Sequence, residues 1–69
     1  MTGSHNRTRA IARLAKLMVM CERYRYLPGL EELGQRLRAH PRTIRRDLEA
    51  LEEAGIAVPQ RLDQYEEVA

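Results

Sequence analysis

The chain has 69 residues, enough for one small domain near the lower size limit at which a single core is stable without a metal, a disulfide or a partner. Hydrophobic residues make up 43% and charged residues 32%, which is typical of a soluble globular chain, and without Trp or Phe its core must be aliphatic. One cysteine excludes an intramolecular disulfide and a thiolate metal cluster, and no apolar run approaches the about 20 residues of a membrane span, so we expect a cytoplasmic protein without metal or cofactor.

A first helix is predicted over residues 7–23, after a flexible N-terminal segment of residues 1–6. The residues at the spacing of one helical face, which we expect to be buried, are Ile11, Leu14, Ala15 and Met18. Further apolar residues widen this surface: Ala10, Leu17, Met20 and Cys21. The helix is therefore expected to contact a second helix or a partner subunit as well. Cys21 is expected to be a packed thiol rather than a nucleophile.

A second, short helix is predicted over residues 30–38. Pro28 and Gly29 interrupt the first pattern, and Gly29 is an acceptable N-cap with acidic residues in the turn that follows. The residues that share its buried face are Leu30, Leu33, Gly34 and Leu37.

A third helix is predicted over residues 41–54, because Pro41 suits the first helical position and Gly55 can take the positive φ that ends a helix. Its expected buried residues are Ile44, Leu48 and Leu51. Two short extended runs follow, Ile56–Val58 and Gln64–Val68, and they predict a small β-hairpin. The fold class is therefore mainly α with a small β-hairpin, in one domain over residues 7–68.

The net charge of +2 is distributed unevenly. Residues 1–46 hold eleven Lys or Arg and three Glu, whereas residues 47–69 hold one Arg and seven Asp or Glu. Such an asymmetry suggests that the basic part meets a polyanion, most often nucleic acid. Charge alone is equally compatible with a solvated helical surface.

The second and third helices are joined by about three residues, and a small residue, Gly34, lies on the inner face of the second, which favours helix-turn-helix geometry. With Ile44 toward the core, Arg42 and Arg46 point away from it and Arg45 flanks them. Cations are disfavoured at a helix start, and binding to phosphates and base acceptors in a major groove would offset that penalty. Alternatively, Arg45 pairs with the residue four positions on, and the other arginines are simply solvated.

Residues 30–56, LEELGQRLRAHPRTIRRDLEALEEAGI, resemble the winged helix-turn-helix of DeoR-like and type-11 transcriptional regulators, and RTIRRDLEALEEAGI is the specific part. With the first helix and the hairpin included, the likeness spans about residues 7–68. The resemblance implies a three-helix core with a β-hairpin wing and sequence-specific binding to double-stranded DNA, usually by a dimer on paired half-sites. The residues that would face DNA at matching positions are Arg42, Thr43, Arg45 and Arg46. Asp47 matches the family acid and is expected to be structural, paired with a nearby arginine.

The sequence departs from the family pattern at three places. Arg38 stands where the family has its turn glycine, so either the turn takes another conformation or a non-glycine residue bears a small strain. His40 stands in place of the usual serine N-cap. The predicted wing lacks basic character, and its one cation, Arg61, is expected at the tip, where it could contact a phosphate.

We predict a sequence-specific double-stranded DNA-binding module of a transcriptional regulator, with residues 41–54 in the major groove, acting as a homodimer or as part of a longer regulator. The further candidate phosphate contacts are Arg7, Arg9, Arg36, Arg38, His40 and Arg61. One alternative is a winged-helix module for protein contact, in which the acidic hairpin and a Leu17/Met20 surface bind the partner. Another is a small accessory DNA-bending protein of a mobile element.

No catalytic arrangement is found in the sequence. His5 and His40 have no Cys pair or carboxylate pattern near them, which argues against a zinc site. The glycines do not approach a phosphate-cradling spacing, and a core of this size is not expected to hold a small-molecule pocket. We therefore expect a protein that is not an enzyme.

Overall fold

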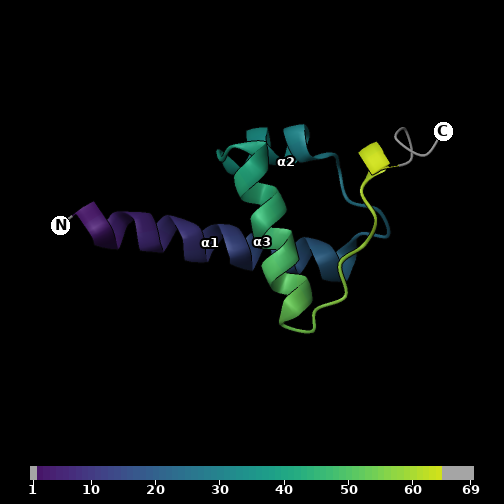
Figure 1. The fold of residues 1–69 in the computed structure, drawn as a ribbon, viewed down its shortest axis with the longest axis horizontal. Coiled ribbons are helices and arrows are strands. Elements are labelled where there is room, and N and C mark those ends of the chain that lie inside the picture. Colours follow the sequence, from purple (N-terminus) through teal and green to yellow (C-terminus); the bar gives the residue numbers. More distant parts are fainter. Residues whose placement is uncertain (1, 65–69) are drawn as a thin grey trace.

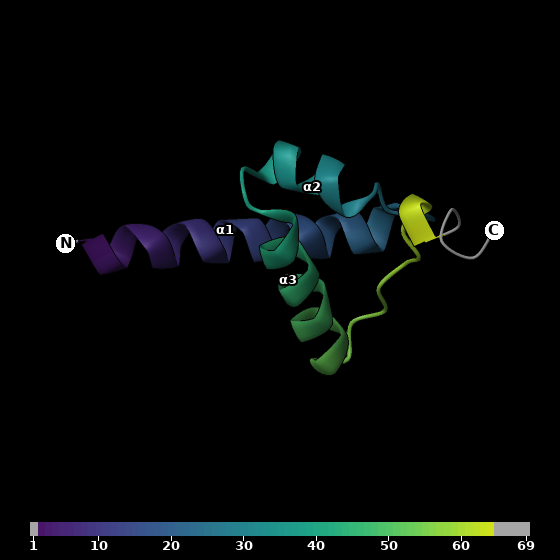
Figure 2. The same cartoon turned by 45° about the horizontal axis from the view of Figure 1, so that its top comes forward.

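The structure is a computed structural model that describes residues 2–64 of the chain, with side chains described for residues 7–64. This range holds three helices: α1 (Thr2–Arg23), α2 (Leu30–Leu37) and α3 (Pro41–Glu53). Helix α3 crosses α1, and the N-terminal half of α1 projects beyond the other two helices (Figures 1 and 2). After α3 an extended segment returns toward the start of α2 (Figure 1).

Helix α1 begins earlier than predicted, at Thr2 rather than Arg7, so residues 2–6 are helical. The earlier start is explained by the ease with which an existing helix is extended. Once a helix exists, each further residue adds one backbone hydrogen bond, and a polar stretch can continue it without burying an apolar face. The projecting end of α1 is such a stretch.

The face of α1 that enters the core differs from the predicted one. Leu17 and Cys21 are buried, and Leu14 packs against them, whereas Ile11 is 67% exposed and Met18 is 40% exposed. The helix has apolar residues on two sides. Helices α2 and α3 cover the side with Leu17 and Cys21 and leave the side with Ile11 and Met18 exposed. The predicted packed state of Cys21 is confirmed, and burial raises the pKa of its thiol.

The two shorter helices confirm the predicted elements, with ends within one residue of those expected. Pro41 is the first residue of α3, and His40 caps it, because its Nδ1 accepts the backbone N–H of Arg42 at 3.0 Å. Gly55 follows α3 with φ of +92°. The expected core residues of α3 are buried, and they pack with Leu33 of α2: Ile44, Leu48 and Leu51.

The turn between α2 and α3 is tight, and Gly34 makes it possible. A Cβ atom at Gly34 would lie 2.6 Å from the carbonyl oxygen of Ala39, closer than real Cβ contacts allow. The N–H of Ala39 donates to the carbonyl oxygen of Gly34 at 2.9 Å. Arg38 takes the left-handed conformation, with φ of 55° and ψ of 49°. Of the two options left by the sequence, a non-glycine residue therefore bears the strain of this turn.

The predicted hairpin over residues 56–68 is not present in the part of the chain that the structure describes. Residues 56–60 are extended without a ladder, and residues 62–64 form a helical turn. Pro59 has no N–H to donate to a strand ladder, and the backbone groups that follow it form hydrogen bonds with Leu27. Its N–H donates to the carbonyl oxygen of Gln60, and its carbonyl oxygen accepts the N–H of Leu62, both at 2.8 Å. Residues 65–68 of the second predicted run lie outside the described residues.

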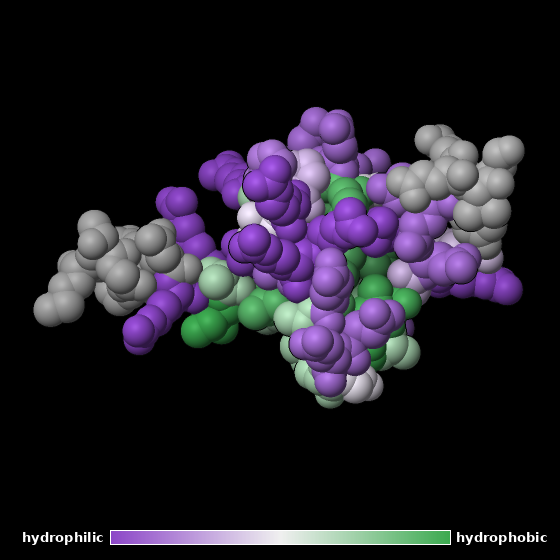
Figure 3. All heavy atoms as spheres, viewed as in Figure 1, coloured by the Kyte–Doolittle hydropathy of each residue, from purple (hydrophilic) through white to green (hydrophobic). Residues whose placement is uncertain are grey.

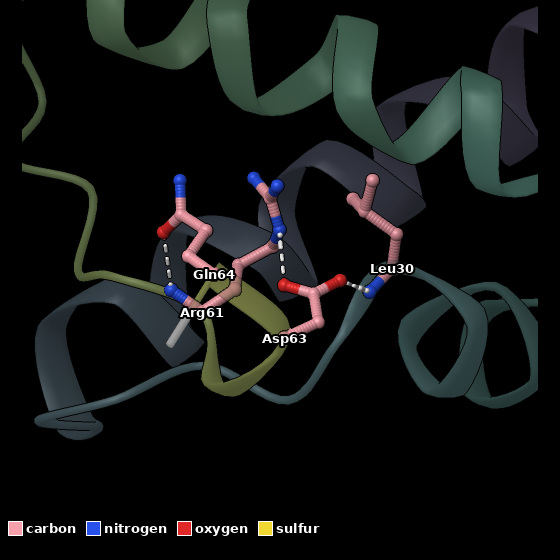
Figure 4. A network of polar contacts seen from close by, with 4 residues as sticks. All are labelled: Leu30, Arg61, Asp63 and Gln64. Carbon is pink, nitrogen blue, oxygen red and sulfur yellow. Dashed lines mark hydrogen bonds and ion pairs between the residues drawn. The ribbon is translucent and has the colours of Figure 1, made fainter. Parts of the chain in front are cut away.

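Asp63 caps helix α2 from the far end of the chain. One carboxylate oxygen accepts the N–H of Leu30 at 3.0 Å, and the other accepts the Nε–H of Arg61 at 3.0 Å (Figure 4). The N-cap residue of α2 is Gly29, which has no side chain to do this. A Cβ atom there would lie 3.1 Å from the Asp63 carboxylate, so the missing side chain leaves room for the remote cap. The C-terminal segment is thereby fixed to the start of α2.

Candidate nucleic-acid interface

The exposed face of α3 carries three arginines in its N-terminal half. Arg42, Arg45 and Arg46 are exposed, whereas Ile44 between them is fully buried. The helical period of 3.6 residues, with Ile44 in the core, directs the arginines outward. The structure therefore places these arginines on the outer side of α3, as the sequence predicts.

Few acidic side chains compete for these arginines. Arg45 Nε lies 3.6 Å from an Oε1 of Glu49, but both side chains are more than two-thirds exposed. Such a pair is screened by water and contributes little. Arg42 and Arg46 form no ion pair with any side chain in residues 7–64. Their guanidinium groups are therefore available to a ligand.

The start of α3 is positively charged by its backbone as well as by its side chains. Its first turn contains no acidic residue and its last turn no basic residue. Aligned peptide dipoles place a partial positive charge at this end, which the three arginines increase. The acidic residues Glu49, Glu52 and Glu53 lie further along, so the electropositive region is confined to one end of α3.

The structure divides the other predicted contact residues into exposed and tethered groups. Those with exposed side chains are Arg7, Arg9, Arg36, Arg38 and His40. Among them, Arg36 forms an ion pair with Glu32 one turn earlier on α2. Thr43 is half-buried.

Arg61 is not at the tip of a hairpin, as the sequence predicted. Its side chain is 17% exposed, and its Nε–H donates to Asp63. Its backbone N–H donates to the side-chain oxygen of Gln64 at 2.8 Å (Figure 4). These contacts follow from the bridge that Arg61 forms with Leu27 in place of the predicted strand pairing.

Beneath the exposed arginines, Asp47 forms an ion pair with Arg13 of α1. The expected pairing of Asp47 with an arginine is thus confirmed, while the identity of the partner came only from the structure. Eleven cations precede Asp47 in the sequence, and spacing along the chain does not single out Arg13. The pair links the helix that carries the arginines to the longest helix of the described chain.

The structure also bears on three other possibilities: a protein-contact surface, a metal site and a membrane-spanning helix. Leu17 is fully buried, so a Leu17/Met20 surface is not presented to a protein partner. In the part of the chain that the structure describes, no group of three or more His, Cys, Asp or Glu could hold a metal ion. None of the helices described is both long and apolar enough to cross a membrane.

A compact trihelical core with a short α2–α3 turn and an arginine-bearing third helix defines a helix-turn-helix domain. The sequence model of the family described as the DeoR-like helix-turn-helix domain matches residues 13–61. The chain belongs to this family, whose domains are not enzymes and whose membership implies DNA binding by a transcriptional regulator. No curated protein and no solved structure matches the chain.

Proposed function

We propose that this chain binds double-stranded DNA sequence-specifically, with α3 as a recognition helix in the major groove. The observation that carries the proposal is the pair Arg42 and Arg46, which are exposed, have no acidic partner among residues 7–64, and lie opposite the buried Ile44. A guanidinium group in a major groove can donate two hydrogen bonds to O6 and N7 of guanine, or it can bind a phosphate.

The charge gradient along α3 supports one way of entering the groove. The N-terminal half enters, and the acidic half rises away from the phosphates, which would repel Glu49, Glu52 and Glu53. Arg45 exchanges its weak pair with Glu49 for a phosphate or a base. Thr43, which is half-buried beside these arginines, contacts the backbone or a base edge at the same end.

Phosphate contacts outside α3 come from exposed cations on the other helices. Arg7 and Arg9 lie on α1, and Arg36 and Arg38 lie at the end of α2 and in the turn. His40, at the start of α3, is also close enough in sequence to reach the backbone beside Arg42. Arg61 contributes least, because Asp63 already holds it.

The active form is proposed to be a homodimer on paired half-sites, or the same domain as part of a longer regulator. One module of this size makes a small number of base and phosphate contacts, and pairing two modules multiplies both affinity and length of sequence read. A two-fold symmetric dimer requires a palindromic site.

The test is selection of bound sequences from a random duplex library, followed by fluorescence titration of the selected duplex at several salt concentrations. If about four to six phosphates are neutralised per copy, log K falls against log salt with a slope of roughly −4 to −5. An enriched motif with that slope supports the proposal, and its half-site spacing gives the oligomeric state. Absence of binding at low salt favours a protein-contact module, and sequence-independent binding with a sharp DNA bend favours an accessory bending protein.

A further inference from the structure

A cationic groove lies beside the recognition helix, between α1 and the end of α2. Its volume is about 260 Å³. Four of its six lining residues are cations, and the residues that line it are Arg9, Ala12, Arg13, Lys16, Leu37 and Arg38. Arg38, in the turn that leads into α3, lines the groove, so the groove adjoins the start of α3. Figure 2 shows α1 running past this turn.

Within residues 7–64, most of the charges in this groove have no acidic partner. Arg13 is neutralised by Asp47, but Arg9, Lys16 and Arg38 form no ion pair with any side chain in the described range 7–64. No acidic residue lines the groove. Like charges that converge without a counter-charge repel one another, and a bound anion would convert this repulsion into attraction.

The backbone of Arg38 gives a second, independent indication. This residue is in the left-handed conformation, which glycine adopts freely and an arginine adopts at a penalty. Its side chain forms no hydrogen bond or ion pair within residues 7–64 that would offset the strain. A strained residue with an unpaired charge at the mouth of a cationic groove points to a ligand outside the chain.

We propose that Arg9, Lys16 and Arg38 bind a phosphate of the DNA backbone next to the segment read by α3. The planar guanidinium of Arg38 suits two phosphate oxygens, and the ammonium of Lys16 acts as a point charge. The contact positions α3 without reading bases. This inference rests on the proposed DNA binding and adds Lys16 to the residues that carry it.

The decisive variant is Arg38→Gly, because a glycine relieves the strain while it removes the charge. Its thermal midpoint is expected to equal or exceed that of the wild type, whereas its affinity for the selected duplex falls about tenfold at about 0.1 M salt and the salt slope loses about one unit. Lys16→Ala is expected to lose affinity similarly, and neither variant changes the preferred sequence. The matched control is Arg23→Ala, which removes an exposed arginine of α1 outside the groove.

Equal affinities and slopes for Arg38→Gly, Lys16→Ala and Arg23→Ala would overturn the proposal. So would a groove that binds inorganic phosphate, seen as NMR shifts in the wild type but not in Arg38→Gly, while DNA affinity is unchanged. A wild-type chain that binds no duplex is a different result, since it removes the proposed function itself.

The apolar outer face of α1 carries a second inference from a separate observation. Ile11, Met18 and Val19 are 67%, 40% and 46% exposed, and the small residue Ala15 lies exposed among them. Apolar atoms are visible where the projecting part of α1 meets the rest of the molecule (Figure 3). A projecting helical end without packing is marginally stable, so a covering partner would stabilise it.

We infer that a second copy of this chain covers this face with its own α1 running antiparallel. At 1.5 Å rise per residue, a pair centred between Leu14 and Ala15 places Ile11 of one copy opposite Met18 of the other. Charge selects the direction. Glu22 is the acidic residue of α1, and the antiparallel register places it beside Arg7 of the other copy, whereas a parallel pair would align like charges.

Sedimentation equilibrium of the full chain tests this contact without DNA. The wild type is expected to shift to twice its mass as concentration rises, and Ile11→Glu to remain monomeric. Leu62→Glu is the matched control, because Leu62 is 57% exposed but lies in the C-terminal segment. Glu22→Arg is expected to weaken association and Arg7→Glu to restore it in the double variant. A wild type that is monomeric at all concentrations, or an Ile11→Glu variant that still associates, would overturn the inference.

Discussion

Arg13 of α1 and Asp47 of α3 form a two-point ion pair between the two helices. Arg13 Nε donates to Oδ2 of Asp47, and Nη2 lies 3.4 Å from Oδ1. The two side chains are 18% and 13% exposed, so water screens the pair less than a surface pair. Asp47 directly follows Arg46, and the pair therefore fixes the rotation of α3 about its axis, which decides where Arg46 points.

Asp47→Ala is expected to lower the free energy of unfolding by about 1–3 kcal/mol, because it leaves the part-buried Arg13 without its acceptor. Urea denaturation measures the change. The control is Glu49→Ala on the same helix, whose exposed pair with Arg45 should contribute less than about 0.5 kcal/mol. Equal losses for the two variants would show that the Arg13 pair does not anchor α3.

Asp63→Ala is expected to destabilise the domain by about 1 kcal/mol, the usual effect of losing an N-cap acceptor. Asp63→Asn keeps an oxygen for the N–H of Leu30 and should lose less. Amide hydrogen exchange at Leu30 reports the same contact locally, and it should accelerate in Asp63→Ala. Unchanged exchange at Leu30 would contradict the remote cap.

Gly34→Ala is expected to destabilise by about 1–3 kcal/mol, since the added methyl would meet the carbonyl oxygen of Ala39 and push the α2–α3 turn open. Gly55→Ala provides a comparison. Its φ is +92° with open space around it, so its loss of about 1 kcal/mol reflects backbone strain without a clash. If thermal unfolding gave Gly34→Ala the smaller loss, close packing at the turn would not be what requires this glycine.

The parts of the fold that short-range chemistry dictates were predictable from the sequence. The ends of α2 and α3 follow from Gly29, Pro41 and Gly55, and the outward direction of Arg42 and Arg46 follows from one buried position and the helical period.

The remaining parts depend on contacts between distant segments. α1 offers two apolar stripes, and which one is buried depends on where α2 and α3 pack. The predicted hairpin required residues 56–58 to pair with residues 64–68, whereas in the structure the backbone groups of Leu27 pair with those of Gln60 and Leu62. The hydrogen bond from the N–H of Leu30 to Asp63 and the ion pair between Arg13 and Asp47 join residues far apart in the chain, so sequence spacing does not predict either contact.

Cys21 is expected to make stability fall in alkaline solution. Burial raises the pKa of its thiol, so above about pH 9 the unfolded chain ionises first, and stability decreases with pH until the folded thiol ionises too. At lower pH the thiol is neutral in both states and has no effect. Urea midpoints between pH 8 and pH 10 should therefore fall more steeply for the wild type than for Cys21→Ser, whose hydroxyl does not titrate there. Parallel pH profiles would contradict burial of the thiol.

Titration of the selected duplex with Arg46→Ala tests most directly whether the exposed arginines at the start of α3 read DNA. The expected loss is about 1–3 kcal/mol of binding free energy with relaxed base preference, while circular dichroism shows unchanged helix content. Arg25→Ala, which removes an exposed arginine between α1 and α2, should keep the base preference. An Arg46→Ala variant with wild-type affinity and wild-type preference for the selected site would contradict the account.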